Sequence, residues 1–214
     1  MANAAKSIKY SDLFWIFFLG SIIGFILEGI WSILRRGQWE NHSATVWGPF
    51  CLVYGIGAVV IYILAAWLDG KNVLIQYMVY AIAGSAVEYL TSLFQEVTFG
   101  SKSWDYSHHT VNLGGRVSFR MTLLWGLLGI AFIYLAYHPL QKLFARYEGK
   151  ANHILVGILT VFMVANLAVS TLAVRRWAER RSGIEPRNRI EVILDKRFGD
   201  NRMEKIYSNM EFIE

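Results

Sequence analysis

Two glutamates, Glu28 and Glu88, lie inside long apolar stretches of the sequence. Each follows a glycine by four residues, Gly24 in the first stretch and Gly84 in the second. A carboxylate in hydrocarbon is costly unless it faces the bundle interior or a wet cavity, or takes up a proton. Paired carboxylates below a glycine-lined crevice could therefore bind a cation, a proton or a cationic group. The alternative is structural: each glutamate pairs with an arginine or a backbone group and locks two helices together.

Further polar side chains extend this candidate site along the chain. Ser92 and Glu96 follow Glu88 at four-residue spacing, so they belong to the same helical face. The segment 99–120 then adds a dense polar cluster with aromatic residues of the kind that anchor at membrane interfaces. The candidate residues for binding a substrate or an ion are Glu28, Glu88, Ser92, Glu96, Trp104, Asp105, Tyr106, Asn112, Arg116 and Arg120.

The arginines decide between the two interpretations of the glutamates. Gly114 and Gly115 permit a turn with positive φ, which would let Arg116 double back toward Glu88 or toward an anionic headgroup. Arg120 is the best candidate for a purely structural pair with a glutamate, because a long side chain near a helix end can reach a few ångströms into the membrane.

The loop also holds the residues of an enzyme hypothesis. Asp105, His108 or His109 could act as acid or base on a lipid-like substrate, with Arg116 holding a phosphate. However, no nucleophile, base and orienting residue follow a catalytic spacing, and adjacent histidines point apart in an extended chain. We therefore expect a protein that is not an enzyme, with no catalytic residue, no metal site and no cofactor.

These residues must be positioned by helices in a membrane. Of the 214 residues, 55% are hydrophobic and 17% are charged, which is not the composition of a soluble protein. Five stretches with few or no charges are each long enough to cross about 30 Å of hydrocarbon as a helix. They comprise residues 13–34, 48–68, 74–97, 122–137 and 154–174.

We predict an all-α integral membrane protein with five transmembrane helices in a domain of residues 1–174. Two segments read as weak copies of each other: Gly-x-x-x-Glu, then a Gly and a Trp in the next loop, then a Gly-led entry into the next span. These repeat halves, about 13–68 and 74–138, would be parallel repeats because both begin on the same side. The fifth span, 154–174, is expected to pack against this core through polar residues such as Asn166 and Ser170.

Basic residues set the predicted orientation. With the N-terminus outside, the inner segments carry eleven Lys and Arg residues and the outer segments six. This bias favours an external N-terminus and a cytoplasmic C-terminus in the cell membrane. The net charge of +5 therefore reflects loop orientation, and no nucleic acid is expected as a partner.

Residues 175–214 form the predicted cytoplasmic tail. The juxtamembrane segment 175–189 holds six basic and two acidic residues, which suits the anionic headgroups of the inner leaflet. Apolar residues then recur with helical spacing in 190–198 and 203–213, with Gly199 between them. We expect two short amphipathic helices that lie on the membrane or contact a partner.

Several short motifs, in their order along the chain, resemble one family of membrane proteins. They are GFILE (24–28), RRGQWEN (35–41), WGPFCLVYGIGA (47–58), SAVEY (85–89), FGSKSWDYS (99–107), NLGGRVSF (112–119) and LLWGLLG (123–129). The chain is similar in this respect to the ABC-transporter type IV permeases, the CmpB-like family, over about residues 13–140. The resemblance implies a small multi-pass membrane protein with a permease role and assigns no catalytic residue. The long charged tail departs from the family pattern.

We therefore expect a membrane transport component with a polar intramembrane site built from the two glutamates. The chain has no G-x-x-x-x-G-K-[ST] motif, so an ATPase would be a separate subunit. Five spans are few for a complete transport path across the membrane, which favours a homo-oligomer. Gly20 with Gly24 offers a surface for close helix packing, either between copies or within one chain. The alternative is a non-catalytic scaffold or sensor whose tail recruits a cytoplasmic protein. An intramembrane lipid-modifying enzyme is the less favoured third hypothesis.

Overall fold

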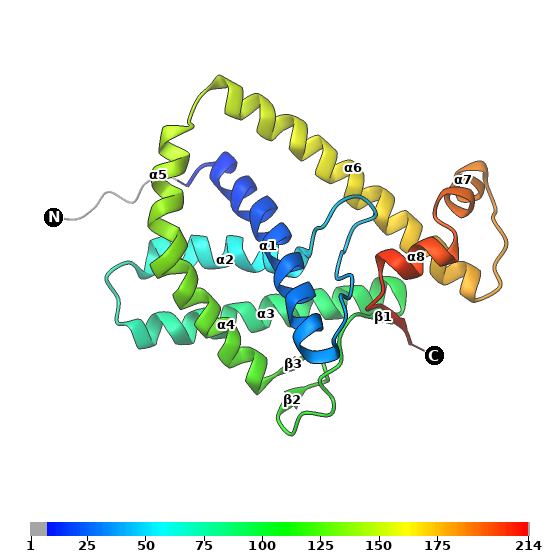
Figure 1. Cartoon of the computed structure of the whole chain (residues 1–214), viewed down its shortest axis with the longest axis horizontal. Coiled ribbons are helices and arrows are strands. Elements are labelled where there is room, and N and C mark those ends of the chain that lie inside the picture. Colours follow the sequence, from blue (N-terminus) through cyan, green and yellow to red (C-terminus); the bar gives the residue numbers. More distant parts are fainter. Residues whose placement is uncertain (1–7, 214) are drawn as a thin grey trace.

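The computed structural model describes residues 8–213 as a mostly helical protein (Figure 1). Its helices are α1 (Tyr10–Arg36), α2 (Leu52–Leu68), α3 (Val73–Phe99), α4 (Phe119–Ala131), the π-helix η1 (Phe132–Tyr137), α5 (His138–Arg146), α6 (Lys150–Arg181), α7 (Arg189–Arg197) and α8 (Asp200–Ile206). Its strands are β1 (Ser101–Lys102), β2 (Asn112–Leu113), β3 (Val117–Ser118) and β4 (Glu211–Phe212). Helices α4, η1 and α5 follow one another without a break.

Within residues 8–213, four helical segments are long and apolar enough to cross a membrane. They are α1, α3, the continuous segment Phe119–Arg146 and α6. Large apolar side chains such as Leu34, Trp67 and Val97 are exposed on the bundle, as expected for a surface that contacts lipid. The protein is therefore a helical membrane protein. Helix α2 is apolar but has 17 residues, so the predicted count of five spans stays a prediction.

The chain before α2 is not helical, and it brings α2 to a start well inside the bundle. Helix α1 ends at Arg36, and residues 37–51, the re-entrant segment, turn back along it and rise toward α6 (Figure 1). The backbone N–H of Cys51 donates to the carbonyl of Ser21, at 2.9 Å. Ser21 precedes the end of α1 by about 22 Å. The sequence-based start of this span at residue 48 is therefore wrong for the helix, because α2 begins at Leu52.

Polar side chains of α6 hold the re-entrant segment in place. Asn166 accepts from the N–H of Trp47 at 3.2 Å and donates to its carbonyl at 2.6 Å. Ser170 accepts from the N–H of Val46 at 2.9 Å. Irregular backbone at membrane depth needs such partners, because no water is available in hydrocarbon to satisfy it. Asn166 and Ser170 do pack against a neighbour, but that neighbour is a non-helical segment.

The core helices pack as two antiparallel hairpins, α1 with α2 and α3 with α4. In the first, a Cβ added at Gly20 would lie 3.0 Å from the Cβ of Ala58. In the second, a Cβ added at Gly129 would lie 2.5 Å from the Cβ of Tyr80. The glycines of α1 therefore pack within one chain, the second of the two possibilities raised for Gly20 and Gly24. The relation of the hairpins as parallel repeats stays a prediction.

The C-terminal tail folds back onto the bundle. Helices α7 and α8 match the two amphipathic helices expected from the sequence, but α8 ends at Ile206 and the chain continues into β4. Strand β4 pairs antiparallel with β1, which directly follows α3, with Ser101 opposite Phe212. The loop after α3 also contains the small β2–β3 hairpin. The tail and this loop therefore meet at the ends of α3 and α6.

Candidate functional site

Both glutamates line one cavity of about 440 Å³. Its walls come from α1, α2, α3, α4 and α6, from the re-entrant segment, from the loop after α3 and from the tail. The lining is mostly apolar and aromatic. The polar and aromatic residues that the argument below uses are Glu28, His42, Tyr54, Glu88, Trp104, Tyr106, Trp125, Tyr207 and Asn209.

Glu88 is held by two neutral donors and is 6% exposed. The hydroxyl of Tyr106 donates to Oε1 at 2.9 Å, and the indole N–H of Trp125 donates to Oε2 at 3.1 Å. Tyr106 comes from the loop after α3, and Trp125 from α4. Burial and the nearby carboxylates of Glu88 and Glu28 raise the pKa of Tyr106, so its phenol stays protonated and keeps its role as donor.

Glu28 has a looser environment, with its side chain 26% exposed. The hydroxyl of Tyr54, from α2, donates to Oε1 at 2.6 Å. The second oxygen, Oε2, lies 4.0 Å from Nδ1 of His42 in the re-entrant segment. Nε2 of His42 in turn lies 3.2 Å from Oε2 of Glu40. One oxygen of Glu28 is therefore fixed by a strong hydrogen bond, and the other faces a titratable ring at a longer distance.

The same three-residue arrangement occurs in both hairpins. A Cβ added at Gly24 would lie 2.3 Å from the Cβ of Tyr54, and one added at Gly84 would lie 2.7 Å from the Cβ of Trp125. In each hairpin the glycine thus leaves room for an aromatic residue of the next helix. That aromatic residue donates a hydrogen bond to the glutamate that follows the glycine by four positions. The two rings are themselves in contact, with centroids 5.8 Å apart. The aromatic residues that bind the two glutamates therefore pack against each other.

The arginines do not pair with these glutamates. Within residues 8–213, neither carboxylate has a Lys or Arg nitrogen within 4.0 Å. Gly114 and Gly115 do adopt positive φ, of 59° and 70°, and Arg116 does turn back. It reaches Glu96, at 2.5 Å, instead of Glu88, because its loop crosses α3 nearer to the helix end. Arg120 is exposed.

The structure brings four of the ten predicted site residues to the cavity: Glu28, Glu88, Trp104 and Tyr106. The other six, Ser92, Glu96, Asp105, Asn112, Arg116 and Arg120, lie outside its lining. Several of these shape the loop instead. Asp105 binds Lys102 at 2.6 Å and accepts from the N–H of Ser107 at 2.8 Å, and these hydrogen bonds lower the pKa of Asp105. Asn112 accepts from the N–H of Gly115 at 2.9 Å. The loop is thereby set to present Tyr106 to Glu88.

Sequence reasoning missed five of the residues at the cavity: His42, Tyr54, Trp125, Tyr207 and Asn209. For two of them a signal exists, because Tyr54 and Trp125 are each followed directly by glycine inside an apolar helix. His42, Tyr207 and Asn209 carry no such signal, since they reach the cavity only through long-range folding. In the described chain, no group of three or more His, Cys, Asp and Glu side chains is placed to hold a metal ion.

Comparison with known proteins gives one family. The family described as "Putative ABC-transporter type IV" matches residues 15–171, nearly three quarters of the chain. This match covers α2, α3 and α4, most of α1 and the first part of α6, and it ends before the tail. No curated protein and no solved structure matches the chain.

Proposed function

The chain belongs to the ABC-transporter type IV family, and on that premise we propose that it is a membrane transport component whose cavity binds a cationic cargo at Glu28 and Glu88. The observation that carries the proposal is the composition of the cavity wall. Two carboxylates line it, and in the described chain no Lys or Arg does. A cavity of this charge in a low-dielectric surrounding attracts positive charge and repels anions.

The walls favour an organic cation with an apolar body. Tyr54, Trp104 and Trp125 offer aromatic faces close to the carboxylates, and such faces attract ammonium groups. The volume of about 440 Å³ lies in the usual range of small-molecule sites. A bare metal ion would need a larger set of oxygen ligands than two carboxylates that already accept hydrogen bonds from Tyr and Trp.

The two glutamates take different parts in this proposal. Glu88 accepts two hydrogen bonds, so its carboxyl group is held in one position and forms a rigid part of the wall. Glu28 keeps an oxygen that no hydrogen bond fixes, and it contacts the cargo directly. In this proposal the end of the cavity where α1 and α3 finish faces the cytoplasm, where a separate ATPase subunit or other cytoplasmic protein would act. The charge bias of the loops supports this orientation. The two hairpins act as repeat halves, and further copies of the chain complete the path.

Thermal unfolding tests the cargo. We would purify the wild type, Glu28→Gln and Glu88→Gln, with Glu96→Gln as a matched control because Glu96 lies on α3 outside the cavity lining. Each protein is melted with tetraalkylammonium ions of increasing size, with an amphiphilic amine, and with Na⁺ and K⁺ at equal ionic strength. Selective binding to the folded state raises the melting temperature.

We expect organic cations to stabilise the wild type and Glu96→Gln, and to lose this effect in both cavity variants. An equal response to Na⁺ and to the organic cations would contradict the cargo class. A response to no cation, or one that persists in Glu28→Gln, would contradict the binding role of the glutamates.

A second candidate function, a scaffold or sensor, has one observation in its favour. Helix α7 exposes Ile190, Val192 and Ile193, with exposed fractions of 63%, 52% and 58%. Such a surface suits recruitment of a cytoplasmic protein. Under this alternative, Ile193→Asp would abolish the cellular function while the cavity variants Glu28→Gln and Glu88→Gln would keep it.

A further inference from the structure

The tail supplies one wall of the cavity, although it lies outside the segment that matches the family. Tyr207, Asn209 and Met210 contribute lining residues. They face walls built by α1, α3 and the re-entrant segment, which are more than 100 residues away in the sequence. The cavity therefore has this wall only when the C-terminal tail is docked.

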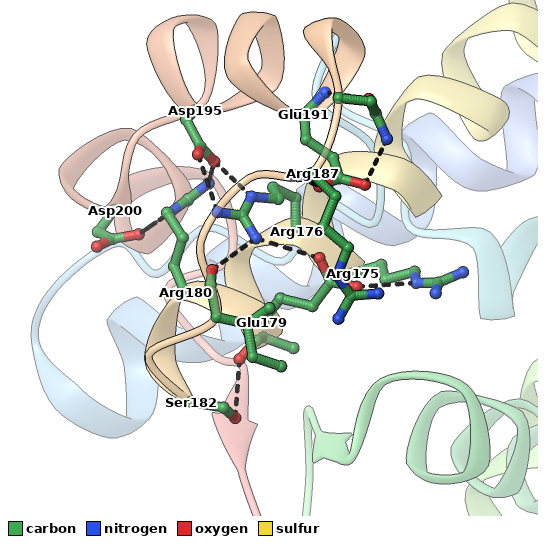
Figure 2. A network of polar contacts seen from close by, with 12 residues as sticks. Arg175, Arg176, Glu179, Arg180, Ser182, Arg187, Glu191, Asp195 and Asp200 are labelled. Atoms are coloured by element: carbon green, nitrogen blue, oxygen red, sulfur yellow. Dashed lines mark hydrogen bonds and ion pairs between the residues drawn. The ribbon is translucent and has the colours of Figure 1, made fainter.

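An ion-pair cluster anchors the tail to the end of α6 (Figure 2). Arg176, which is 2% exposed, binds both oxygens of Asp195, at 2.9 and 3.0 Å. Arg180 binds Asp195 at 2.6 Å and Asp200 at 2.8 Å. Burial opposes ionisation of Asp195, but the hydrogen bonds from both arginines outweigh it and lower the pKa of Asp195. Two of the six arginines expected at lipid headgroups, Arg176 and Arg180, thus bind carboxylates within the chain.

A hydrophobic cluster continues this attachment toward the cavity. Trp177 of α6 packs with Leu194, Phe198, Met203 and Tyr207 of the tail, all of them buried. The re-entrant segment joins the same cluster through Val46. Helices α7 and α8 are therefore firmly held, and Tyr207 is the last fully buried residue of the described tail.

Beyond Tyr207, none of the residues 208–213 is fully buried. Met210 and Phe212 rest partly buried against the hydrophobic cluster, and the ring of Phe212 lies 4.9 Å from that of Trp177. The residues 208–213, here called the closing segment, pair with β1 over two residues, and the N–H of Ile213 donates to the carbonyl of Gly100 at 2.8 Å. Ser208 donates to the carbonyl of Asn41 at 3.1 Å. Asn209 lies 3.2 Å from Nδ1 of His42. A two-residue ladder, a few hydrogen bonds and two partly buried apolar side chains open more readily than the fully buried core that holds α7 and α8.

We infer that the closing segment is a detachable wall of the cavity, held over its mouth by the α7–α8 anchor, and that its release opens the cavity at the end where α1 and α3 finish. Through Asn209 the closing segment touches His42, the residue next to the looser glutamate. Release of the segment therefore exposes the cavity and at the same time removes Asn209 from Nδ1 of His42, while Nε2 of the ring keeps its contacts with Glu40 and Ser32. A partner that binds the tail would couple its own binding to access.

The chain carries its own reporter for this opening. Cys51 lines the cavity, is 8% exposed and is the only cysteine in the sequence. A charged, membrane-impermeant maleimide can react with it only after entering the cavity or after unfolding. The labelling rate in purified protein therefore measures access directly.

The test compares wild type with a chain that ends at Tyr207. The truncation removes the closing segment and keeps the anchor and Tyr207. We expect Cys51 of the truncated chain to label at least about ten-fold faster. Lys196→Ala, an exposed change on α7, is the matched control and should label at the wild-type rate. Equal rates in wild type and the truncated chain would overturn the inference.

A second variant guards against a truncation that fails to fold, which circular dichroism and size-exclusion chromatography would reveal. The double change Ser208→Ala and Asn209→Ala removes the polar contacts with Asn41 and His42 and leaves the chain intact. We expect about three-fold faster labelling from the loss of these hydrogen bonds, and an unchanged rate would again overturn the inference. Labelling needs no cargo, so this result is independent of the cargo proposal.

Discussion

Glu28 and Glu88 occupy corresponding places in two helical hairpins, yet one is loosely and the other tightly surrounded. Glu88 is 6% exposed and accepts from Tyr106 and Trp125, whereas the Glu28 side chain is 26% exposed and accepts one hydrogen bond, from Tyr54. The hairpins make the same contribution in both cases, a glycine and an aromatic donor. The difference comes from the loops, because one loop adds a second donor and the other adds His42 at 4.0 Å.

This difference separates two roles that the same motif can serve. A carboxyl group whose oxygens both accept hydrogen bonds is held in one position, since any rearrangement would leave a buried donor unpaired. A carboxylate with one free oxygen can exchange partners at low cost. The comparison therefore assigns the adjustable contact to Glu28, which is also the glutamate closest to the tail through His42.

Substituting the glycines that both hairpins share is expected to have the largest effect on the free energy of unfolding. Gly24→Ala and Gly84→Ala place a Cβ at 2.3 and 2.7 Å from the Cβ of Tyr54 and Trp125. Each change must displace a ring from its glutamate, so we expect a loss of about 3 kcal/mol of unfolding free energy in both cases. Gly157→Ala in α6 is the control, because nothing lies within 4 Å of an added Cβ there. Denaturant titration followed by tryptophan fluorescence provides the measurement, and a harmless Gly24→Ala would show that the hairpins are not alike.

The next largest effect on stability separates the two glutamates, each replaced by glutamine. In Glu88→Gln, the amide oxygen can accept from only one of the two donors. If its NH2 group faces Trp125, two donors oppose each other; if it faces Tyr106, the hydroxyl must turn to accept and its own proton loses its acceptor, so we expect a cost of about 2 kcal/mol. In Glu28→Gln, the hydroxyl of Tyr54 can donate to the amide oxygen, so the cost stays below about 1 kcal/mol. Parallel melts of the two variants check the order. Equal costs would mean that the two environments are energetically equivalent.

The smallest losses of stability are expected when the two tyrosine donors are removed one at a time. Tyr106→Phe removes a donor from the buried Glu88, and we expect a loss of about 1 kcal/mol. Tyr54→Phe keeps its ring against Gly24 and removes a donor from the more exposed Glu28, so a few tenths of a kcal/mol are expected. The two unfolding free energies are measured in the same detergent. A larger loss from Tyr54→Phe would reverse the assignment of fixed and adjustable carboxylates.

The sequence determined the membrane environment, the family and the two intramembrane glutamates. Long apolar runs and rare charges leave few physical alternatives to helices in a bilayer. A glutamate at helical spacing from a glycine likewise identifies an interior position. The pattern also indicated that Arg116 turns back at Gly114 and Gly115, because positive φ is a local property of glycine.

The tertiary structure alone decided which residues meet at the cavity. Arg116 binds Glu96 instead of Glu88, and the predicted second helix begins four residues late because residues 48–51 belong to the re-entrant segment. His42, Tyr207 and Asn209 reach the cavity over separations that no local pattern encodes. Local spacing fixes which face of a helix is polar. Which partner that face receives depends on long-range packing, where the chain must satisfy buried polar groups with whatever donors the whole fold brings near.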